Sequence, residues 1–253
     1  MSQDQSKRNL ERYLDTYTEL PFEIIQEHFR RRALIDFLDS SRFDTVTEIG
    51  CGRSSLFEHW LPVQIAQTIE PIPNLLNLVR EKLALEPVWV GFESRVEEAT
   101  KIQELKLADL VVVSSILHEV ENPREFLLSI KEITKPGGLM VIIVTNKKSL
   151  HRILGVQLGL LTSLDEKTQT EVHMQQSHGA YSREELKEEI EGADLDLLEI
   201  HSIFPKLFSH SQMSELLERK ILTPEFLEVM ENLSPELQEF GSELFAVVRR
   251  NSD

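Results

Sequence analysis

The chain has 253 residues, of which 41% are apolar and 28% are charged, a balance typical of a globular protein rather than a disordered or fibrous one. Its 43 acidic residues against 27 basic ones give a net charge of -16, and this disfavours nucleic acid as a partner because phosphate backbones repel an acidic surface. The single cysteine, Cys51, excludes an internal disulfide framework and a multi-cysteine zinc site.

Hydropathy along the chain gives no sign of a membrane segment. The polar start, residues 1–10, has no apolar signal core, and the longest apolar runs, 110–113 and 139–144, are too short to span a bilayer. We therefore expect a cytoplasmic protein with no membrane partner, no nucleic-acid partner and no bound metal. The length suits one large domain, or one domain with a subdomain.

The N-terminal part is predicted to form a helical cap over residues 1–40. Residues 1–20 are polar with scattered aromatics and predict a helix or a mobile arm, whereas apolar residues recur at helical spacing over 21–39. The run 30–32, three arginines, predicts a solvated helix face. Three residues of the cap are candidates for gating a site and contacting its substrate: Tyr13, Tyr17 and Glu23.

Strands and helices then alternate, which predicts a doubly wound α/β sheet. The apolar run 109–114 and the run 139–145 suit buried parallel strands. The expected strands are 45–49, 65–70, 88–92, 109–114 and 139–145, and the expected helices are 54–60, 74–85 and 123–134, the last ended by a Lys-Pro-Gly-Gly turn at 135–138.

The C-terminal part predicts two more strands, 195–203 and 242–249. Ser182 and Glu185 have capping-box spacing and predict the start of a helix over 182–191. The segments 146–181 and 204–240 fall outside a minimal sheet, so we expect them to form a cover over one end of it.

A glycine loop follows the strand at 45–49 and precedes a predicted helix. Gly50 and Gly52 let the backbone turn tightly and approach a ligand closely. Ser55 stands where a dinucleotide fingerprint has its third glycine. Glu70 ends the next strand, where a carboxylate accepts hydrogen bonds from both ribose hydroxyls of an adenosine.

Four segments, VTEIGCGRSS, QTIEPIPN, ADLVVVSSILHEVENP and ITKPGGLMVIIV, resemble the class I S-adenosylmethionine-dependent methyltransferases in order and spacing over residues 44–146. The resemblance implies a Rossmann-like, seven-stranded, doubly wound sheet whose last strand, 242–249, is antiparallel. It implies a methyltransferase domain over 41–253, with substrate-cover insertions at about 146–181 and 204–240.

The same resemblance implies S-adenosylmethionine as cofactor, S-adenosylhomocysteine as product, and a set of cofactor-binding residues. The methionine portion would be lined by Glu48, Gly50, Cys51 and Gly52, the ribose held by Glu70 beside Pro71, the adenine contacted by Arg95, Val96 and Glu97, and the cofactor flanked by Ser114, Ser115 and Ile116. We interpret Cys51 as a small residue that fits the loop rather than as a nucleophile.

The competing cofactor is NAD. The missing third glycine weakens close packing against a pyrophosphate, and S-adenosylmethionine carries no phosphate that would require it. The Lys-Pro-Gly-Gly turn also favours the methyltransferase interpretation.

Candidate catalytic residues follow the fourth strand. His118 lies four residues beyond its end, at the carboxyl edge where α/β sheets bind ligands, and is the first candidate for a general base, with Glu119 to orient it or to bind a substrate amine. The candidate substrate-binding residues beyond the fifth strand are His151 and Arg152, the latter as a partner for a carboxylate or phosphate, and His178 and Tyr181 in a glycine-containing loop.

Two later segments, TNKKSLHRILGVQLGLL and SHGAYSREELKEEIEGADLDLLE, more loosely resemble a bacterial group that modifies sugars and other small metabolites. We therefore expect O-methylation of a sugar-like or specialised metabolite. The alternatives left open are N-methylation of a small amine or peptide, a cofactor-binding scaffold without activity, and an NAD-dependent oxidoreductase. A homodimer is also left open.

Overall fold

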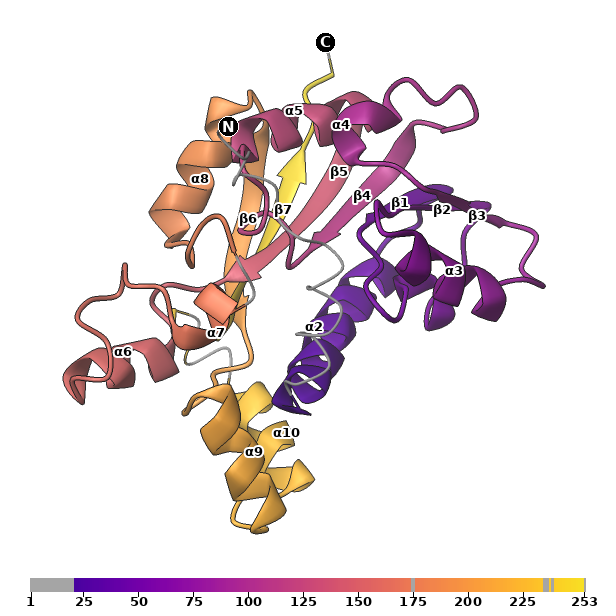
Figure 1. Cartoon of the computed structure of the whole chain (residues 1–253). Helices are drawn as coiled ribbons and strands as arrows, with labels where there is room; N and C mark the ends of the chain where they lie inside the picture. The colour runs from indigo at the N-terminus through magenta and orange to yellow at the C-terminus, as the bar shows by residue number, and fades with distance from the viewer. Residues whose placement is uncertain (1–20, 174–175, 234–236, 238, 253) are drawn as a thin grey trace, which may run out of the picture.

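The computed structural model of the chain describes residues 21–173, 176–233, 237 and 239–252. This part contains a seven-stranded sheet in the order β3-β2-β1-β4-β5-β7-β6 (Figure 1). Strands β1 to β5 pair in parallel, whereas β7 pairs antiparallel with both β5 and β6, which confirms the expected fold class. The strands are β1 (Thr45–Ile49), β2 (Ile65–Ile69), β3 (Trp89–Phe92), β4 (Ala108–Ser114), β5 (Thr134–Thr145), β6 (Asp196–Ile203) and β7 (Glu243–Arg249).

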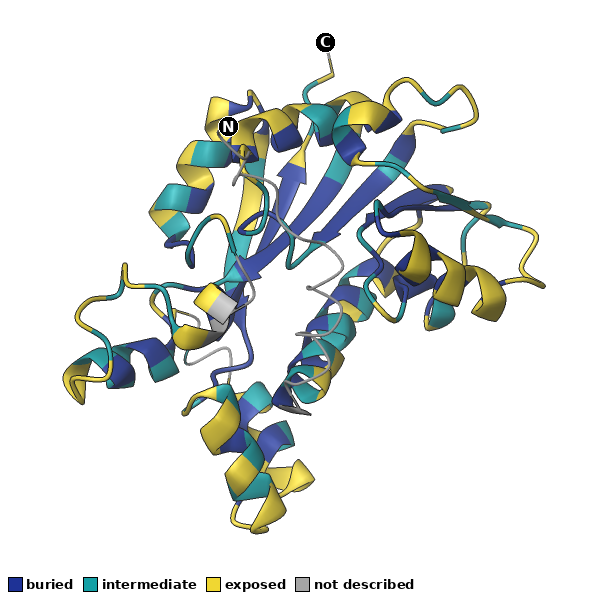
Figure 2. Cartoon of the chain, in the orientation of Figure 1, coloured by how far each residue is buried: buried dark blue, intermediate teal, exposed yellow. Residues whose placement is uncertain are grey.

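Alternating side chains of the central strands build one core on each face of the sheet. In β4, Leu110 and Val112 join the core on one face, and Val111 and Val113 join the core on the other. All four are at most 1% exposed, and Figure 2 shows the middle of the central strands buried. A strand buried on both faces needs apolar residues at consecutive positions, so the unbroken run of valines follows from its central place.

Helices cover both faces of the sheet. The face of Leu110 is covered by α3 (Pro73–Lys82) and the second half of α2 (Pro21–Asp39), and the opposite face by α4 (Val96–Ala99), α5 (Pro123–Ile133) and α8 (Arg183–Gly192). Ser182 caps α8 by accepting from the backbone N–H of Glu185, whose side chain bonds back to Ser182, which confirms the predicted capping box.

A third apolar cluster lies beyond the sheet and joins the start of α2 to the segment after β6. Phe22 and Phe29 of α2 pack with Phe204, with Met213 of α9 (His210–Glu218) and with Leu227 of α10 (Pro224–Asn232). Figure 1 shows α9 and α10 beside the start of α2, at the end of the sheet where β5 finishes. The helices α6 (Leu150–Gln157) and α7 (Gln169–His173) belong to the same end.

The structure differs from the predicted elements in several places, including α6 and α7 in the segment 146–181, for which no helix was predicted. The expected helix over 54–60 is only a single 3₁₀ turn, η1 (Leu56–Glu58), because Ser55 caps it and Pro62 blocks any extension. The short helix α4 was not expected. Strand β5 begins at Thr134 and includes the predicted turn at 135–138. The predicted helix or arm over 1–20 lies outside the described residues.

Within the described ranges, none of the helices has both the length and the apolar character that crossing a lipid bilayer requires.

Candidate functional site

A cavity of about 700 Å³ lies at the carboxyl ends of β1, β2 and β4, between the sheet and the helices beyond it. Side chains from residues 23–34, from the loops after the parallel strands, and from the segments 146–181 and 204–240 line it together. Among the predicted site residues, the cavity is lined by Glu23, Glu48, Gly50, Cys51, Gly52, Glu70, Pro71, Arg95, Val96, Glu97, Ser114, Ser115, Ile116, His118, Glu119, His151 and Arg152.

Two of the predicted residues that the structure describes are not among those that line the cavity. His178 and Tyr181 lie beside it: the backbone N–H of His178 donates to the carbonyl of His118 at 2.9 Å, and Tyr181 is 6% exposed in the core below α8. Tyr13 and Tyr17 lie outside the described residues.

The glycine loop forms the floor of one end of the cavity. Gly50 has a φ of +71° and Gly52 a φ of +55°, and the N–H of Gly50 donates to the carbonyl of Ile69 at 2.8 Å, so the loop turns directly off β1. A Cβ on Gly50 would come within 2.3 Å of the Ile116 side chain, whereas a Cβ on Gly52 would meet no protein atom within 4 Å. Gly50 therefore allows both the turn and the close approach of the loop after β4.

This difference makes the two glycines a matched pair. Gly50→Ala is expected to lower the free energy of unfolding by about 2–4 kcal/mol, because it combines left-handed backbone strain with overpacking. Gly52→Ala is expected to cost only about 1–2 kcal/mol, since only the backbone term remains. Urea unfolding of both variants measures the difference, and equal losses would show that the contact with Ile116 relaxes without cost.

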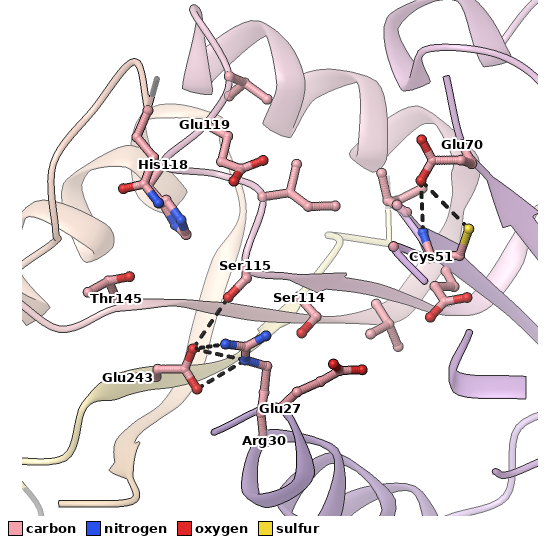
Figure 3. Close-up of a pocket in the computed structure, with 18 of the residues that line it drawn as sticks. Glu27, Arg30, Cys51, Glu70, Ser114, Ser115, His118, Glu119, Thr145 and Glu243 are labelled. Carbon is pink, nitrogen blue, oxygen red and sulfur yellow. Dashed lines mark hydrogen bonds and ion pairs between the residues drawn. The ribbon is translucent and has the colours of Figure 1, made fainter. Parts of the chain in front are cut away.

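Glu70 lies directly after β2 and is 3% exposed. Its Oε2 accepts from the N–H of Cys51 at 3.1 Å (Figure 3). Its Oε1 accepts from the N–H of Ile72 at 2.9 Å, so one carboxylate connects the glycine loop to the start of α3. Burial raises the pKa of Glu70 against these hydrogen bonds. The carboxylate retains further lone pairs for a ligand.

Two more acids stand at this end of the cavity. The carboxylate of Glu48 accepts from the Ser55 hydroxyl at 2.5 Å and from the N–H of Leu56 at 2.7 Å, and burial raises its pKa to about 7. Glu48 thus fixes the start of η1. Glu97 lies in the first turn of α4, which Arg95 precedes.

Cys51 is 5% exposed, and burial with the nearby carboxylates of Glu70 and Glu48 raises the pKa of its thiol far above the usual range. A protonated thiol is a poor nucleophile. The geometry therefore suits the interpretation of Cys51 as a small loop residue.

The other end of the cavity is bounded by the loop after β4. Ser115 has a φ of +60°, which turns the chain so that His118 and Glu119 stand beside the cavity in Figure 3. His118 is 3% exposed. The backbone thus brings a buried imidazole to the same cavity as Glu70, from a different strand end.

Arg152 lies on α6 and is 2% exposed. Its Nη1 donates to both oxygens of Glu171 at 2.9 and 3.0 Å, and its Nη2 donates to the carbonyls of Leu164 and Glu166 at 3.0 and 2.6 Å. These contacts connect α6 to α7, and the carboxylate of Glu171 neutralises the charge of the guanidinium within the protein. His151, beside it, lines the cavity, and burial lowers its pKa well below the usual range.

Sequence reasoning missed a cluster of charges at this end. Arg30 is 7% exposed rather than solvated: its Nε donates to both oxygens of Glu243 at 2.8 and 3.0 Å, and its Nη2 donates to Glu23 at 3.0 Å. Lys206 and His210 also line the cavity here. The helical spacing of Arg30 from Phe22 could have indicated that the two lie on the same buried face of the helix. Lys206 lies in an irregular segment that carries no such pattern.

Known proteins are similar to this chain in sequence. A family model described as a methyltransferase domain matches residues 23–200. The mitochondrial ubiquinone biosynthesis O-methyltransferase of Schizosaccharomyces pombe is 27% identical over 142 residues, which are 49% of this chain and 52% of that protein. The thiol S-methyltransferase TMT1B of Rattus norvegicus is 27% identical over 109 residues, which are 42% of this chain and 44% of that protein. The chain thus spans about half the length of the curated relatives it matches.

Solved structures share the fold at low identity. The N-methyltransferase NodS from Bradyrhizobium japonicum, in complex with S-adenosylhomocysteine, has a TM-score of 0.54 and is 15% identical, with 96% of this chain and 99% of that chain covered.

Proposed function

Because the chain belongs to the class I S-adenosylmethionine-dependent methyltransferases, we propose that it transfers a methyl group from S-adenosylmethionine to an oxygen atom of a small-molecule acceptor. The relatives named above methylate oxygen, sulfur or nitrogen according to their names, so similarity alone leaves the acceptor atom open. The choice of oxygen rests on the site.

The residues at the glycine-loop end fit this cofactor. Gly50 and Gly52 keep the loop free of side chains next to the cavity, and Glu70 offers a buried carboxylate with lone pairs for ribose hydroxyls. Glu48 and Glu97 also line the cavity. When bound, S-adenosylmethionine supplies a methyl group on a positively charged sulfur.

One observation carries the proposal: a single cavity of about 700 Å³ is lined both by Glu70 and by His118. A small acceptor therefore shares one cavity with the cofactor, and residues of α2 and α9 line that cavity as well. Holding two reactants in line contributes up to roughly 7–11 kcal/mol to lowering a barrier.

His118 is the proposed general base. A hydroxyl must lose its proton as it attacks, and an imidazole takes up a proton near neutral pH. Glu119 follows it in the loop and would orient the imidazole or contact the acceptor. The loop after β4 presents both side chains to the cavity (Figure 3).

His118→Ala is expected to lower kcat by about 10²–10⁴-fold while leaving the Kd of S-adenosylhomocysteine within about twofold, because a base acts on the acceptor and not on the cofactor. The assay follows release of S-adenosylhomocysteine over a panel of phenols, aliphatic alcohols, sugars and amines. Binding of S-adenosylhomocysteine is measured by calorimetry.

His28→Ala is the matched control, since His28 is an exposed histidine on the outer side of α2. It should keep full activity. Full turnover by His118→Ala would contradict the role of His118 as base. If the wild type methylates only amines, the acceptor atom is nitrogen. If the wild type binds the cofactor but methylates no acceptor, the scaffold alternative is favoured.

A further inference from the structure

Lys206 is a buried cation at the end of the cavity away from the glycine loop. It is 2% exposed and lies in the loop between β6 and α9. Its Nζ donates to the Gln26 side-chain oxygen at 2.9 Å and lies 5.8 Å from the centre of the Phe22 ring. An ammonium has three hydrogens to donate, and within the described ranges the neutral amide of Gln26 is the only hydrogen-bond acceptor recorded for it.

The carboxylates nearest to Lys206 are committed to other cations. Glu23 and Glu243 both bond Arg30, and Glu171 bonds Arg152. They attract Lys206 through space, yet burial outweighs them and lowers its pKa to about 8. A charged group that keeps unused donors in a cavity is stabilised by an oxygen ligand of opposite charge.

Two histidines stand beside Lys206 in the same cavity. His151 comes from α6 and His210 from α9, and the buried Nδ1 atom of each has no hydrogen-bond partner among the described residues. Burial, and next the positive charge of Lys206, lower the pKa of both well below the usual range. Neutral imidazoles add hydrogen-bonding atoms without adding charge.

The backbone before Lys206 is held in an uncommon conformation. Phe204 has a φ of +48°, which costs about 1–3 kcal/mol for a residue other than glycine. Its ring stacks on Phe29 at 4.3 Å and lies 6.2 Å from the ring of Phe22, contacts that offset the strain. The loop is thereby fixed so that Lys206 lies against α2.

We propose that Lys206, with His151 and His210, binds an anionic oxygen group of the acceptor, a carboxylate in the simplest case. The inference deepens the proposed function and rests on it, since the same cavity holds the methyl donor at its other end. An acceptor that carries a positive amine at this position would be repelled by Lys206. The anion contact expected of Arg152 from the sequence is thus assigned to Lys206.

Matched pairs of acid and amide test the proposal. Benzoate against benzamide, and glucuronate against glucuronamide, are titrated by ligand-observed NMR into protein saturated with S-adenosylhomocysteine. The acid of at least one pair should bind about tenfold more tightly than its amide, as expected for one charge-assisted hydrogen bond. Equal binding of acid and amide in both pairs would overturn the proposal.

Variants locate the effect. Lys206→Met should abolish the preference for the acid, and Lys206→Arg should keep part of it. Lys101→Met, which removes the same charge from an exposed position, should change nothing. If Lys206→Met still prefers the acid over the amide, the anion binds elsewhere and the proposal fails. If Lys206→Met does not fold, the pH dependence of binding to the wild type provides the test.

In the wild type, the affinity for benzoate should fall from about pH 7 to about pH 9 as Lys206 loses its proton, while benzamide binding stays flat. The groups that face Lys206 are Glu23 and Arg30 of α2, His151 and Arg152 of α6, Glu171 of α7, His210 of α9 and Glu243 of β7. The two histidines, whose pKa values are lowered, are already neutral over this range. A flat benzoate profile would overturn the proposal.

Failure here is distinguishable from failure of the proposed function. Intact binding of S-adenosylhomocysteine and turnover of a neutral acceptor, with no preference for acids, overturn the anion site alone. Loss of cofactor binding in the wild type would overturn the methyltransferase function itself.

Discussion

Replacing Arg30 with Met is expected to lower the free energy of unfolding by about 3–5 kcal/mol, because it leaves the buried carboxylate of Glu243 and the partly buried carboxylate of Glu23 without the cation they share. Glu243 is 1% exposed, and the Glu23 side chain is 15% exposed. Arg30 donates to Glu243 at 2.8 and 3.0 Å and to Glu23 at 3.0 Å, and the hydroxyl of Ser115 adds a contact to Glu243 at 3.3 Å. This network holds α2 to the start of β7 across the cavity (Figure 3).

Urea unfolding measures the loss, and its pH dependence identifies the cause. In the variant, burial without a cation favours the protonated carboxyls, so the deficit against the wild type should shrink as the pH falls and these groups take up protons. A deficit that does not change with pH would assign the effect to lost packing of the arginine stem instead.

Arg32→Met is the matched control on the same helix. Arg32 pairs with Glu228 at 2.6 Å, but their side chains are 32% and 47% exposed, so the expected loss is only about 0–1 kcal/mol. In the double variant Arg30→Met/Glu243→Leu, part of the lost free energy of unfolding should return, because the second change removes the buried carboxylate that the first left without a cation. Equal losses for Arg30→Met and Arg32→Met would contradict a buried network.

The fold could be predicted because its signals are local. Consecutive apolar residues in 109–114 require burial on both faces, and the glycines at 50 and 52 require a turn after a strand; both follow from short-range sterics and hydropathy. The resemblance supplied the antiparallel last strand, which β7 confirms. The predicted helix at 54–60 was wrong because the hydrogen bonds of Glu48 and Ser55 define a single turn.

The end of the cavity away from the glycine loop could not be predicted, because its residues are held by contacts between distant parts of the sequence. Arg30 and Glu243 are 213 positions apart, and no local pattern links a first helix to a last strand. The run of three arginines suggested a solvated face, yet Arg30 is buried on the side of Phe22 and Gln26, and Arg31 also lines the cavity. Lys206 depends on the strained turn at Phe204, which propensity opposes.

Replacing Glu70 with Ala is expected to weaken S-adenosylhomocysteine binding by about 10–150-fold, because hydrogen bonds to a charged group contribute about 1.5–3 kcal/mol. Glu70→Gln should lose less, since it keeps one acceptor oxygen. Calorimetry measures both. Glu81→Gln, an exposed acid on α3, removes the same charge and should leave the Kd unchanged.

Glu70 also accepts from the N–H groups of Cys51 and Ile72, so a weaker Kd alone does not separate a ribose contact from a disordered loop. Adenosine and a dideoxy analogue that lacks both ribose hydroxyls provide the distinction. If Glu70 bonds the ribose, the wild type binds adenosine more tightly than the dideoxy analogue, and Glu70→Ala binds both equally. The cycle of two proteins and two ligands then gives a coupling free energy between Glu70 and the ribose hydroxyls. If Glu70 only fixes the loop, both ligands weaken by the same factor in the variant, and the ribose assignment fails.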